Sequence, residues 1–247
     1  MTTRGPIIRV AAPTIEQLVR QGDAGGTIAG VGVGTSRVLV QELNSSSTNI
    51  IDTTNRWVAG ITGTGALTNT STSTSARQYF LLNCPAGADE VRLTSRANGP
   101  NPLSITAANE VFTKVVLEFN FRVVNLANIN NAAFFMGFQS GASANTRAGT
   151  DIIGFKLLGD VLGVMTDAAG TETVADLVTA PASLTAWNKC KIVLRNGSVD
   201  FYVNGVLDQS ITTNLPANPL YINFTCTSEA LVAAALHVTH IVHYALE

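Results

Sequence analysis

Three histidines lie close together near the end of the chain, in the stretch HVTHIVHY, and the imidazole ring is a common metal ligand. We interpret this stretch as a β-strand. On a strand, His237 and His243 share a face but lie about 20 Å apart at ~3.3 Å per residue, and His240 points the other way. The three rings therefore cannot bind one metal ion, and we interpret them as ordinary strand residues.

Other stretches that could hold a metal, a nucleotide or a nucleophile do not fit those chemistries. Asp151, Asp160 and Asp167 are separated along the chain without EF-hand spacing, and isolated turn aspartates explain them better. The glycine-rich GVGVGT lacks the final spaced glycine of a dinucleotide-binding turn. Neither a Gly-Lys-Ser/Thr phosphate loop nor a Gly-x-Ser-x-Gly nucleophile elbow occurs. We expect no cofactor and no metal centre.

The three cysteines, Cys84, Cys190 and Cys226, are far apart in the sequence and odd in number. A disulfide framework or a zinc site would need closer spacing. Cys190 and Cys226 alternate with apolar neighbours. We therefore predict buried free thiols and synthesis in a reducing compartment.

The chain is poor in charge. Only 13% of its 247 residues are charged, the net charge is −2 and the pI is near 5.9. This gives no electrostatic basis for binding nucleic acid or an anionic membrane. Thr, Asn, Ser and Gly supply the polar remainder, and such a surface suits a β-rich protein whose outer faces meet other subunits.

The two ends of the chain carry no targeting or membrane signal. Arg4, Arg9 and Glu16 interrupt the apolar residues of the N-terminal stretch, so no signal peptide is visible. The C-terminal ALVAAALHVTHIVHYAL is too short, and too rich in histidine, for a membrane-spanning helix. We predict that residues 1–36 form an extended arm or linker with a short helix, TIEQLVRQG, and an ordinary ragged terminus is the open alternative. The domain proper is predicted over residues 37–247.

Two Asn-Gly pairs mark turns in the stretch WNKCKIVLRNGSVDFYVNGVL. A two-residue loop at Asn196-Gly197 needs positive φ twice, which asparagine tolerates and glycine adopts freely. Counting outward pairs apolar residues on one face: Leu194 with Val199, Ile192 with Phe201, and Cys190 with Val203. The opposite face carries polar residues, namely Lys189, Lys191, Arg195, Ser198, Asp200 and Tyr202.

The second turn is less regular. A three-residue loop over 204–206 aligns Val203 with Leu207 and Val199 with Ile211, with a bulge at the glycine. The whole stretch is therefore predicted to be a three-stranded antiparallel meander with one buried face.

Most of the chain after residue 36 carries strand signals. In VFTKVVLEFNFRVV, the alternating apolar residues from Val115 to Val123 share one face. AAFFMGF is apolar on both faces, which is typical of a central strand. Further strands are predicted in SRVLVQEL, IIGFKLL, DVLGVMTD, TETVADLV, LYINFTCT and LHVTHIVHY. Many strands with short turns, and scarcely a helix, predict an all-β antiparallel sandwich or jelly roll.

The order of these elements resembles the concanavalin A-like lectin/glucanase superfamily in its laminin-G-like form. IIDTTNRW leads to GADEVRLTSRA, then to FTKVVLEFNFRV, FFMGF, IIGFKLL, the Asn-Gly meander and a final LHVTHIVHY. The resemblance covers residues 45–247. It implies that the last strand returns beside the first, and that Trp187 packs as a core residue at the start of its strand. It is specific for fold and not for function, because the superfamily includes lectins, glycosidases, adhesion modules and inert virion components.

Glycosidases of this superfamily carry a Glu-x-Asp-x-Glu cluster on one strand. The matching stretch here, LEFNFR, offers Glu118 but places Asn120 and Arg122 where the other acids would be. Acid/base hydrolysis of a glycoside needs at least two carboxylates. We therefore predict that the protein is not an enzyme and that Glu118 is a solvent-facing strand residue.

Sugar binding would require exposed aromatic rings beside hydrogen-bonding side chains. Trp57, Tyr202 and Tyr221 are the candidates for a ligand or partner surface, since the two tyrosines lie on the polar faces of their strands. Trp187 is the other large aromatic candidate, but its place in the superfamily favours burial over stacking on a ligand.

The leading functional hypothesis from the sequence is a non-enzymatic phage virion protein: a capsid decoration (cement) protein, or otherwise a tail or fibre component. It would be made in the host cytoplasm, form a homo-oligomer, and bind the major capsid protein or another virion protein through the arm over 1–36. The alternative is a carbohydrate-binding or adhesion module of lectin type, with a glycan as partner. Nucleic acid and membrane are not expected partners.

Overall fold

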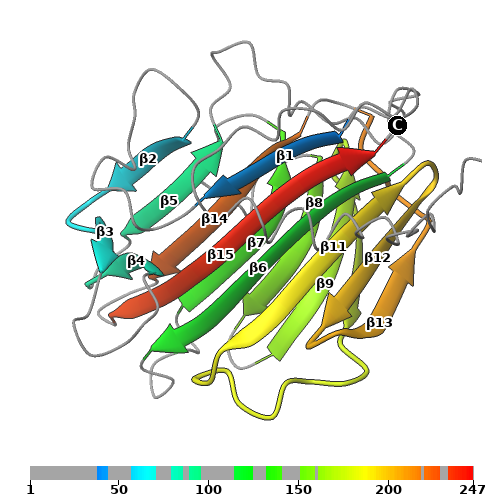
Figure 1. Cartoon of the computed structure of the whole chain (residues 1–247). Coiled ribbons are helices and arrows are strands. Elements are labelled where there is room, and N and C mark those ends of the chain that lie inside the picture. Colours follow the sequence, from blue (N-terminus) through cyan, green and yellow to red (C-terminus); the bar gives the residue numbers. More distant parts are fainter. Residues whose placement is uncertain are drawn as a thin grey trace, which may run out of the picture. The chain divides into compact units, whose positions relative to one another are not determined.

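The computed structural model describes residues 38–43, 57–70, 79–85, 89–95, 114–124, 132–140, 151–158, 161–217, 220–228 and 233–246. Within these ranges no helix occurs, and the strands form two antiparallel sheets stacked as a sandwich (Figure 1). This confirms the predicted all-β architecture. The predicted arm and helix over 1–36 lie outside the described residues, so that part of the prediction stays a prediction.

The first sheet has eight strands. Its order is β13 (Val206–Ile211), β12 (Ser198–Val203), β11 (Asn188–Arg195), β6 (Lys114–Val124), β15 (Ala234–Leu246), β4 (Tyr79–Cys84) and β3 (Ala66–Thr70). The eighth strand, β1 (Val38–Leu43), pairs with the C-terminal half of β15, and β4 pairs with its N-terminal half. The last strand thus returns beside the first, as predicted.

The second sheet has seven strands. Its order is β10 (Thr171–Asp176), β9 (Val161–Ala168), β8 (Ile152–Leu158), β7 (Ala132–Gln139), β14 (Tyr221–Ser228), β5 (Glu90–Ser95) and β2 (Trp57–Thr62). The doubly apolar AAFFMGF forms β7, which lies in the middle of this sheet between β8 and β14, as predicted. It is central because both of its faces are buried.

The hydrophobic core lies between the two sheets and is centred on phenylalanines. The ring of Phe119 on β6 lies 5.1 Å from that of Phe224 and 6.1 Å from that of Phe155, both on the second sheet. Phe155 in turn lies 5.4 Å from Phe201 on β12. All three pairs are nearly perpendicular, the edge-to-face arrangement that aromatic quadrupoles favour. These contacts join the two sheets.

The three cysteines are buried and free, as predicted. The thiol of Cys84 on β4 donates to the carbonyl oxygen of Cys226 on β14 at 3.0 Å, a contact that links the two sheets. Burial raises the pKa of Cys190, whose thiol therefore remains protonated and behaves as a small apolar side chain.

The first turn of the meander has the predicted register and a different backbone geometry. All three predicted pairs between β11 and β12 are present. Only Gly197 has a positive φ, at 76°, so the prediction of two positive φ values at this turn is wrong. The pairing is fixed by burial of the alternating apolar residues. This burial requires a loop of two residues, but it does not require a particular type of turn.

The second turn corrects the predicted loop length. Val203 pairs with Val206 across a two-residue loop, in which Asn204 and Gly205 both have positive φ. Val199 pairs with Ile211, as predicted, because the extra residue is accommodated further along, where the register shifts between Phe201 and Tyr202. The bulge thus exists but does not lie at the glycine.

A second bulge, in β15, overturns the prediction for the histidines. The register against β6 shifts by one residue between Thr239 and Val242, and His240 in the shift has a φ of 54°. His237 therefore faces away from the core, whereas His243 faces into it, so the two do not share a face. The predicted alternation fails because one inserted residue reverses the face to which every later side chain of the strand points.

The C-terminal stretch tested for a membrane helix forms strand β15. Among the described residues, none belongs to a helix with the length and apolarity needed to cross a membrane.

Candidate functional site

Strands β6 and β11 expose a row of polar and charged side chains on the outer face of the eight-stranded sheet, the face directed away from the core. Val115, Leu117 and their alternate neighbours on β6 are in the core, as are Cys190, Ile192 and Leu194 on β11. The residues between them must face outward, because successive side chains of a strand alternate. They include Val116 and Val193, which pair with each other and are buried. We call the polar and charged outward residues the β6–β11 strip: Lys114, Glu118, Asn120, Arg122, Lys189, Lys191 and Arg195.

Four side chains meet at one end of this strip and form what we call the Arg122 cluster: Tyr79, Arg122, Trp187 and His237. The Tyr79 and His237 rings stack, with centroids 4.2 Å apart, and the Tyr79 and Trp187 rings meet edge to face at 6.0 Å. The guanidinium carbon of Arg122 lies 5.0 Å from the Trp187 ring centroid and 5.7 Å from that of Tyr79. The arginine is thus held against two aromatic rings, a favourable cation–π arrangement.

His237 fixes the orientation of Arg122. The two residues are directly paired across β15 and β6, and Nε of Arg122 donates to Nδ1 of His237 at 3.0 Å. Burial and the adjacent arginine charge lower the pKa of His237 from 6.5 to about 4. The imidazole is therefore neutral at pH 7, and its Nδ1 accepts the hydrogen bond that holds the guanidinium in place.

Trp187 belongs to this outer face, which corrects its predicted place in the core. Strand β11 begins at Asn188, whose buried side chain donates to the carbonyl oxygens of Ser183 and Ala186 at 2.8 and 2.9 Å. Because Asn188 points inward with Cys190, the preceding Trp187 must point outward. Trp187 lies three residues before Cys190, an odd spacing that on a strand predicts opposite faces. This spacing alone would have indicated the outward position of Trp187.

Glu118 lies in the middle of the strip and is partly exposed. Its carboxylate pairs with the ammonium of Lys189 at 2.6 Å. Asn120 and Arg122, not acids, follow it along the outer face, as the sequence indicates. The face therefore presents one carboxylate of β6, engaged by a lysine, beside an amide and a guanidinium.

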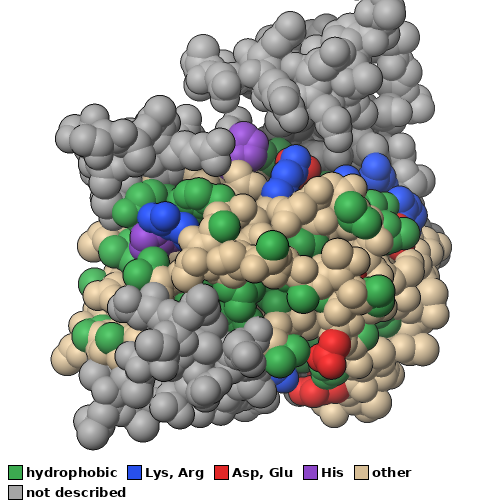
Figure 2. Space-filling view, turned by 90° about the horizontal axis from the view of Figure 1, so that it is seen from below, with side chains coloured by type: hydrophobic (Ala, Val, Ile, Leu, Met, Phe, Trp, Pro, Cys, Tyr) green, Lys and Arg blue, Asp and Glu red, His purple; other side chains and the backbone are tan. Residues whose placement is uncertain are grey.

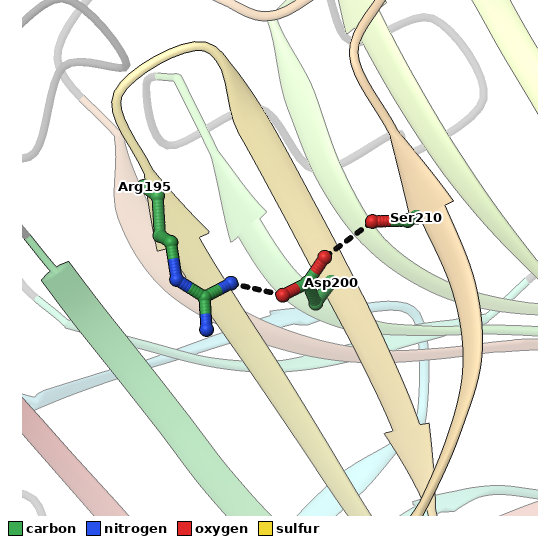
Figure 3. A network of polar contacts seen from close by, with 3 residues as sticks. All are labelled: Arg195, Asp200 and Ser210. Atoms are coloured by element: carbon green, nitrogen blue, oxygen red, sulfur yellow. Dashed lines mark hydrogen bonds and ion pairs between the residues drawn. The ribbon is translucent and has the colours of Figure 1, made fainter.

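Strands β11, β12 and β13 are joined on the outer face by a polar network near the β11–β12 turn (Figure 3). Asp200 on β12 accepts from Arg195 on β11 and from the hydroxyl of Ser210 on β13. Next to it, the ammonium of Lys191 lies 4.3 Å from the ring centroid of Tyr202. These contacts fix the side chains that cover this part of the outer face.

The structure does not bring the three predicted surface aromatics together. Tyr202 is on β12 of the eight-stranded sheet, and Tyr221 opens β14 of the seven-stranded sheet. Both are partly exposed on faces directed away from the core, and hence on opposite sides of the sandwich. Trp57 opens β2, an edge strand of the seven-stranded sheet, and its side chain lies outside the described residues. A role for each of them in binding stays a prediction.

Two of the predicted turn aspartates are neighbours in space. Oδ1 of Asp167 accepts from the backbone nitrogens of Asp151 and Gly170 at 3.1 and 2.9 Å, and Oδ1 of Asp151 accepts from Ala169 at 3.2 Å. The two residues stabilise the β9–β10 turn and the positive φ of 63° at Asp151. Asp160 lies outside the described residues. No group of three or more potential metal ligands occurs in the described part of the chain.

The surface seen from below carries few charged side chains, as the composition indicated (Figure 2). A histidine and a basic side chain are seen together in this view, among hydrophobic side chains.

No protein-family model and no curated protein sequence matches the chain. Several solved structures match its fold. The β-glucanase of Bacillus licheniformis matches with a TM-score of 0.56 and 14% identity, over 83% of this chain and 97% of that one. An alginate lyase from polysaccharide lyase family 7 matches with a TM-score of 0.51 and 15% identity, over 67% and 78%. The carbohydrate recognition domain of Emp47p matches with a TM-score of 0.53 and 8% identity, over 77% and 88%.

At these identities the likeness concerns the fold. The chain has the concanavalin A-like jelly-roll fold that the order of its strands predicted.

Proposed function

We propose that this protein is a carbohydrate-binding module of lectin type, without hydrolytic activity, and that it binds its glycan at the Arg122 cluster on the outer face of the eight-stranded sheet. The observation that carries the proposal is the meeting of Tyr79, Trp187, Arg122 and His237 at one place on that face. This is the alternative, not the leading hypothesis, of the sequence analysis.

The chemistry of the cluster suits a sugar. Tyrosine and tryptophan rings offer a flat apolar surface for the C–H face of a pyranose, and each keeps a polar atom for hydrogen bonding. Arg122 supplies donors beyond the Nε bonded to His237, and Asn120 two residues away on the same face offers both a donor and an acceptor. A few polar groups placed beside aromatic rings are the usual composition of a small-molecule site.

The matched structures support the proposal through what their descriptions say of them: one is a carbohydrate recognition domain, one a β-glucanase and one an alginate lyase. Two of these are enzymes. We assign no hydrolysis to this chain because Glu118 is the sole carboxylate on the outer face of β6 and is engaged by Lys189 at 2.6 Å. Two carboxylates flanking the bond are needed for that reaction.

A glycan array probed with the wild-type protein and with Trp187→Ala tests the proposal. We expect the wild type to bind a defined set of glycans, and Trp187→Ala to lose at least about tenfold in affinity, because a stacking surface is removed. Lys156→Ala, at a partly exposed position on β8 in the other sheet, is the control and should bind like the wild type. An array without any bound glycan, or a Trp187→Ala variant that is folded by circular dichroism and binds unchanged, would contradict the proposal.

A further inference from the structure

The β6–β11 strip follows two paired strands, and the buried outward valines Val116 and Val193 separate its Lys114–Arg195 end from the rest. In the register of the two strands, Lys114 lies opposite Arg195, Glu118 opposite Lys191, and Asn120 opposite Lys189. Arg122 is eight residues beyond Lys114 along β6, which corresponds to roughly 27 Å at ~3.4 Å per residue. The strip therefore runs from the Arg195 network at one end to the Arg122 cluster at the other.

The strip has a positive charge that the chain as a whole does not have. The outward-facing charged residues of β6, β11 and β12 are five cations and two carboxylates, whereas the net charge of the whole chain is −2. The cations are Lys114, Arg122, Lys189, Lys191 and Arg195, and the carboxylates are Glu118 and Asp200. Charge of one sign along one face attracts a ligand of the opposite sign.

Internal ion pairs do not cancel this charge. Glu118 is engaged by Lys189, and Asp200 by Arg195. Within the part of the chain that the structure describes, no carboxylate lies at ion-pair distance from Lys114, Lys191 or Arg122. Among the described residues these three cations therefore have no carboxylate partner, and Lys191 also lies over the ring of Tyr202.

Arg122 is the best placed of the three. Its Nε donates to His237, and its guanidinium carbon lies over the Trp187 and Tyr79 rings. The two terminal nitrogens are the donors that this arrangement offers to a ligand. A guanidinium presents these donors as a planar fork that matches the two oxygens of a carboxylate. A carboxylate bound there would hold its own sugar ring beside the aromatic rings of the cluster.

We propose that the ligand of this site is a linear, carboxylate-bearing polysaccharide of the polyuronate type, which lies along the part of the β6–β11 strip from Arg122 to Lys191, with one uronate carboxylate on Arg122 and another near Lys191. This inference rests on the proposed glycan-binding function and specifies its ligand. Carboxylates spaced along the glycan match Arg122 and Lys191, whereas a neutral glycan would leave both cations without a counter-charge.

The test compares the affinity of the full-length protein for each acidic oligosaccharide with its affinity for the carboxyl-reduced counterpart, by isothermal titration calorimetry. Oligosaccharides of galacturonate, glucuronate and mixed guluronate–mannuronate serve as probes. Carboxyl reduction keeps the rings and linkages and removes only the charge. We expect at least one acidic probe to bind about tenfold or more tightly than its reduced form, and its affinity to fall as salt is raised.

Two variants locate the effect. Arg122→Met should remove most of the preference for the acidic form, and Lys156→Met, a partly exposed lysine on the outer face of β8 in the other sheet, should keep it. If Arg122→Met does not fold, the comparison of acidic and reduced probes on the wild type still decides.

The outcomes separate this inference from the function on which it rests. Equal binding of acidic and reduced glycans would overturn the polyuronate assignment and leave the carbohydrate-binding function intact. Equal binding of dextran sulfate, a sulfated glycan without carboxylates, would show recognition of negative charge alone and would also overturn the assignment. Failure of every acidic and neutral glycan to bind would overturn both proposals.

Discussion

Replacement of His243 by leucine should stabilise the protein, and the gain should grow as the pH falls. The imidazole of His243 is 1% exposed and lies in the core, with its ring centroid 6.0 Å from that of Phe138. Neither of its ring nitrogens has a hydrogen-bond partner among the described residues. A leucine of similar size would fill the same space without burying a polar group.

The magnitude follows from two separate contributions. Removal of the unpaired polar group should stabilise the protein by about 1–3 kcal/mol at any pH. Burial also lowers the pKa of His243 from 6.5 to about 4, so between these values the unfolded chain binds a proton that the folded protein does not. Stability is therefore lost as the pH falls through this window, and at pH 5 the loss from this one histidine is about 2 kcal/mol, against nearly zero at pH 7.5.

Urea unfolding followed by circular dichroism, at pH 7.5 and pH 5.0, measures both contributions. The difference in the free energy of unfolding between His243→Leu and the wild type should be about 2 kcal/mol larger at pH 5.0 than at pH 7.5. His237 also titrates in this range, but it is present in both proteins and cancels. His240→Asn, at an exposed position in the same strand whose positive φ asparagine tolerates, is the control and should change stability by less than about 0.5 kcal/mol. A difference that does not vary with pH would refute the placement of His243 as a buried neutral imidazole.

Three further predictions concern the turn, the acid and the N-terminal segment. Gly197→Val should lower the free energy of unfolding by about 1–3 kcal/mol through backbone strain at its φ of 76°; a steric clash adds nothing, because a Cβ there would meet no atom within 4 Å. An unchanged melting temperature would contradict the turn geometry. Glu118→Gln should change stability by less than about 1 kcal/mol and leave any glycan hydrolysis unchanged, so hydrolysis lost in this variant would refute the non-enzyme prediction. Deletion of residues 1–36 should leave the circular dichroism spectrum and melting temperature nearly unchanged but abolish co-sedimentation with capsids if the protein is a virion component; attachment at full affinity would refute the anchoring role.

Local alternation in the sequence predicted much of the fold. The face formed by Val115 to Val123, the pairing of Ile192 with Phe201 and the central place of β7 all follow from burial of apolar residues at a period of two. The predictions failed where one extra residue enters a strand. The burial pattern predicted a bulge in the β12–β13 hairpin but placed it at Gly205, and it gave no sign of the bulge in β15, because the position of a bulge is selected by packing against a partner strand that local pattern does not identify.

The candidate site was harder to predict than the fold. Tyr79, Arg122, Trp187 and His237 come from four strands or strand ends far apart in the chain, and they meet because β4, β15, β6 and β11 are neighbours in the sheet. Alternation predicts that Arg122 faces outward, but strand order decides what lies beside it. The assignment of Trp187 to the core came from a resemblance, and the parity of its own strand would have been the better guide.

The most direct test of glycan binding at the Arg122 cluster is the fluorescence of Trp187 during a glycan titration. The chain has two tryptophans, so Trp57→Phe leaves Trp187 as the sole reporter, and Trp187→Phe leaves Trp57. With a glycan that calorimetry shows to bind, the Trp57→Phe protein should give a saturable change in emission with the calorimetric Kd, and the Trp187→Phe protein should give none. A silent Trp187, or a response from Trp57 alone, would contradict the placement of the binding site on the outer face of the eight-stranded sheet.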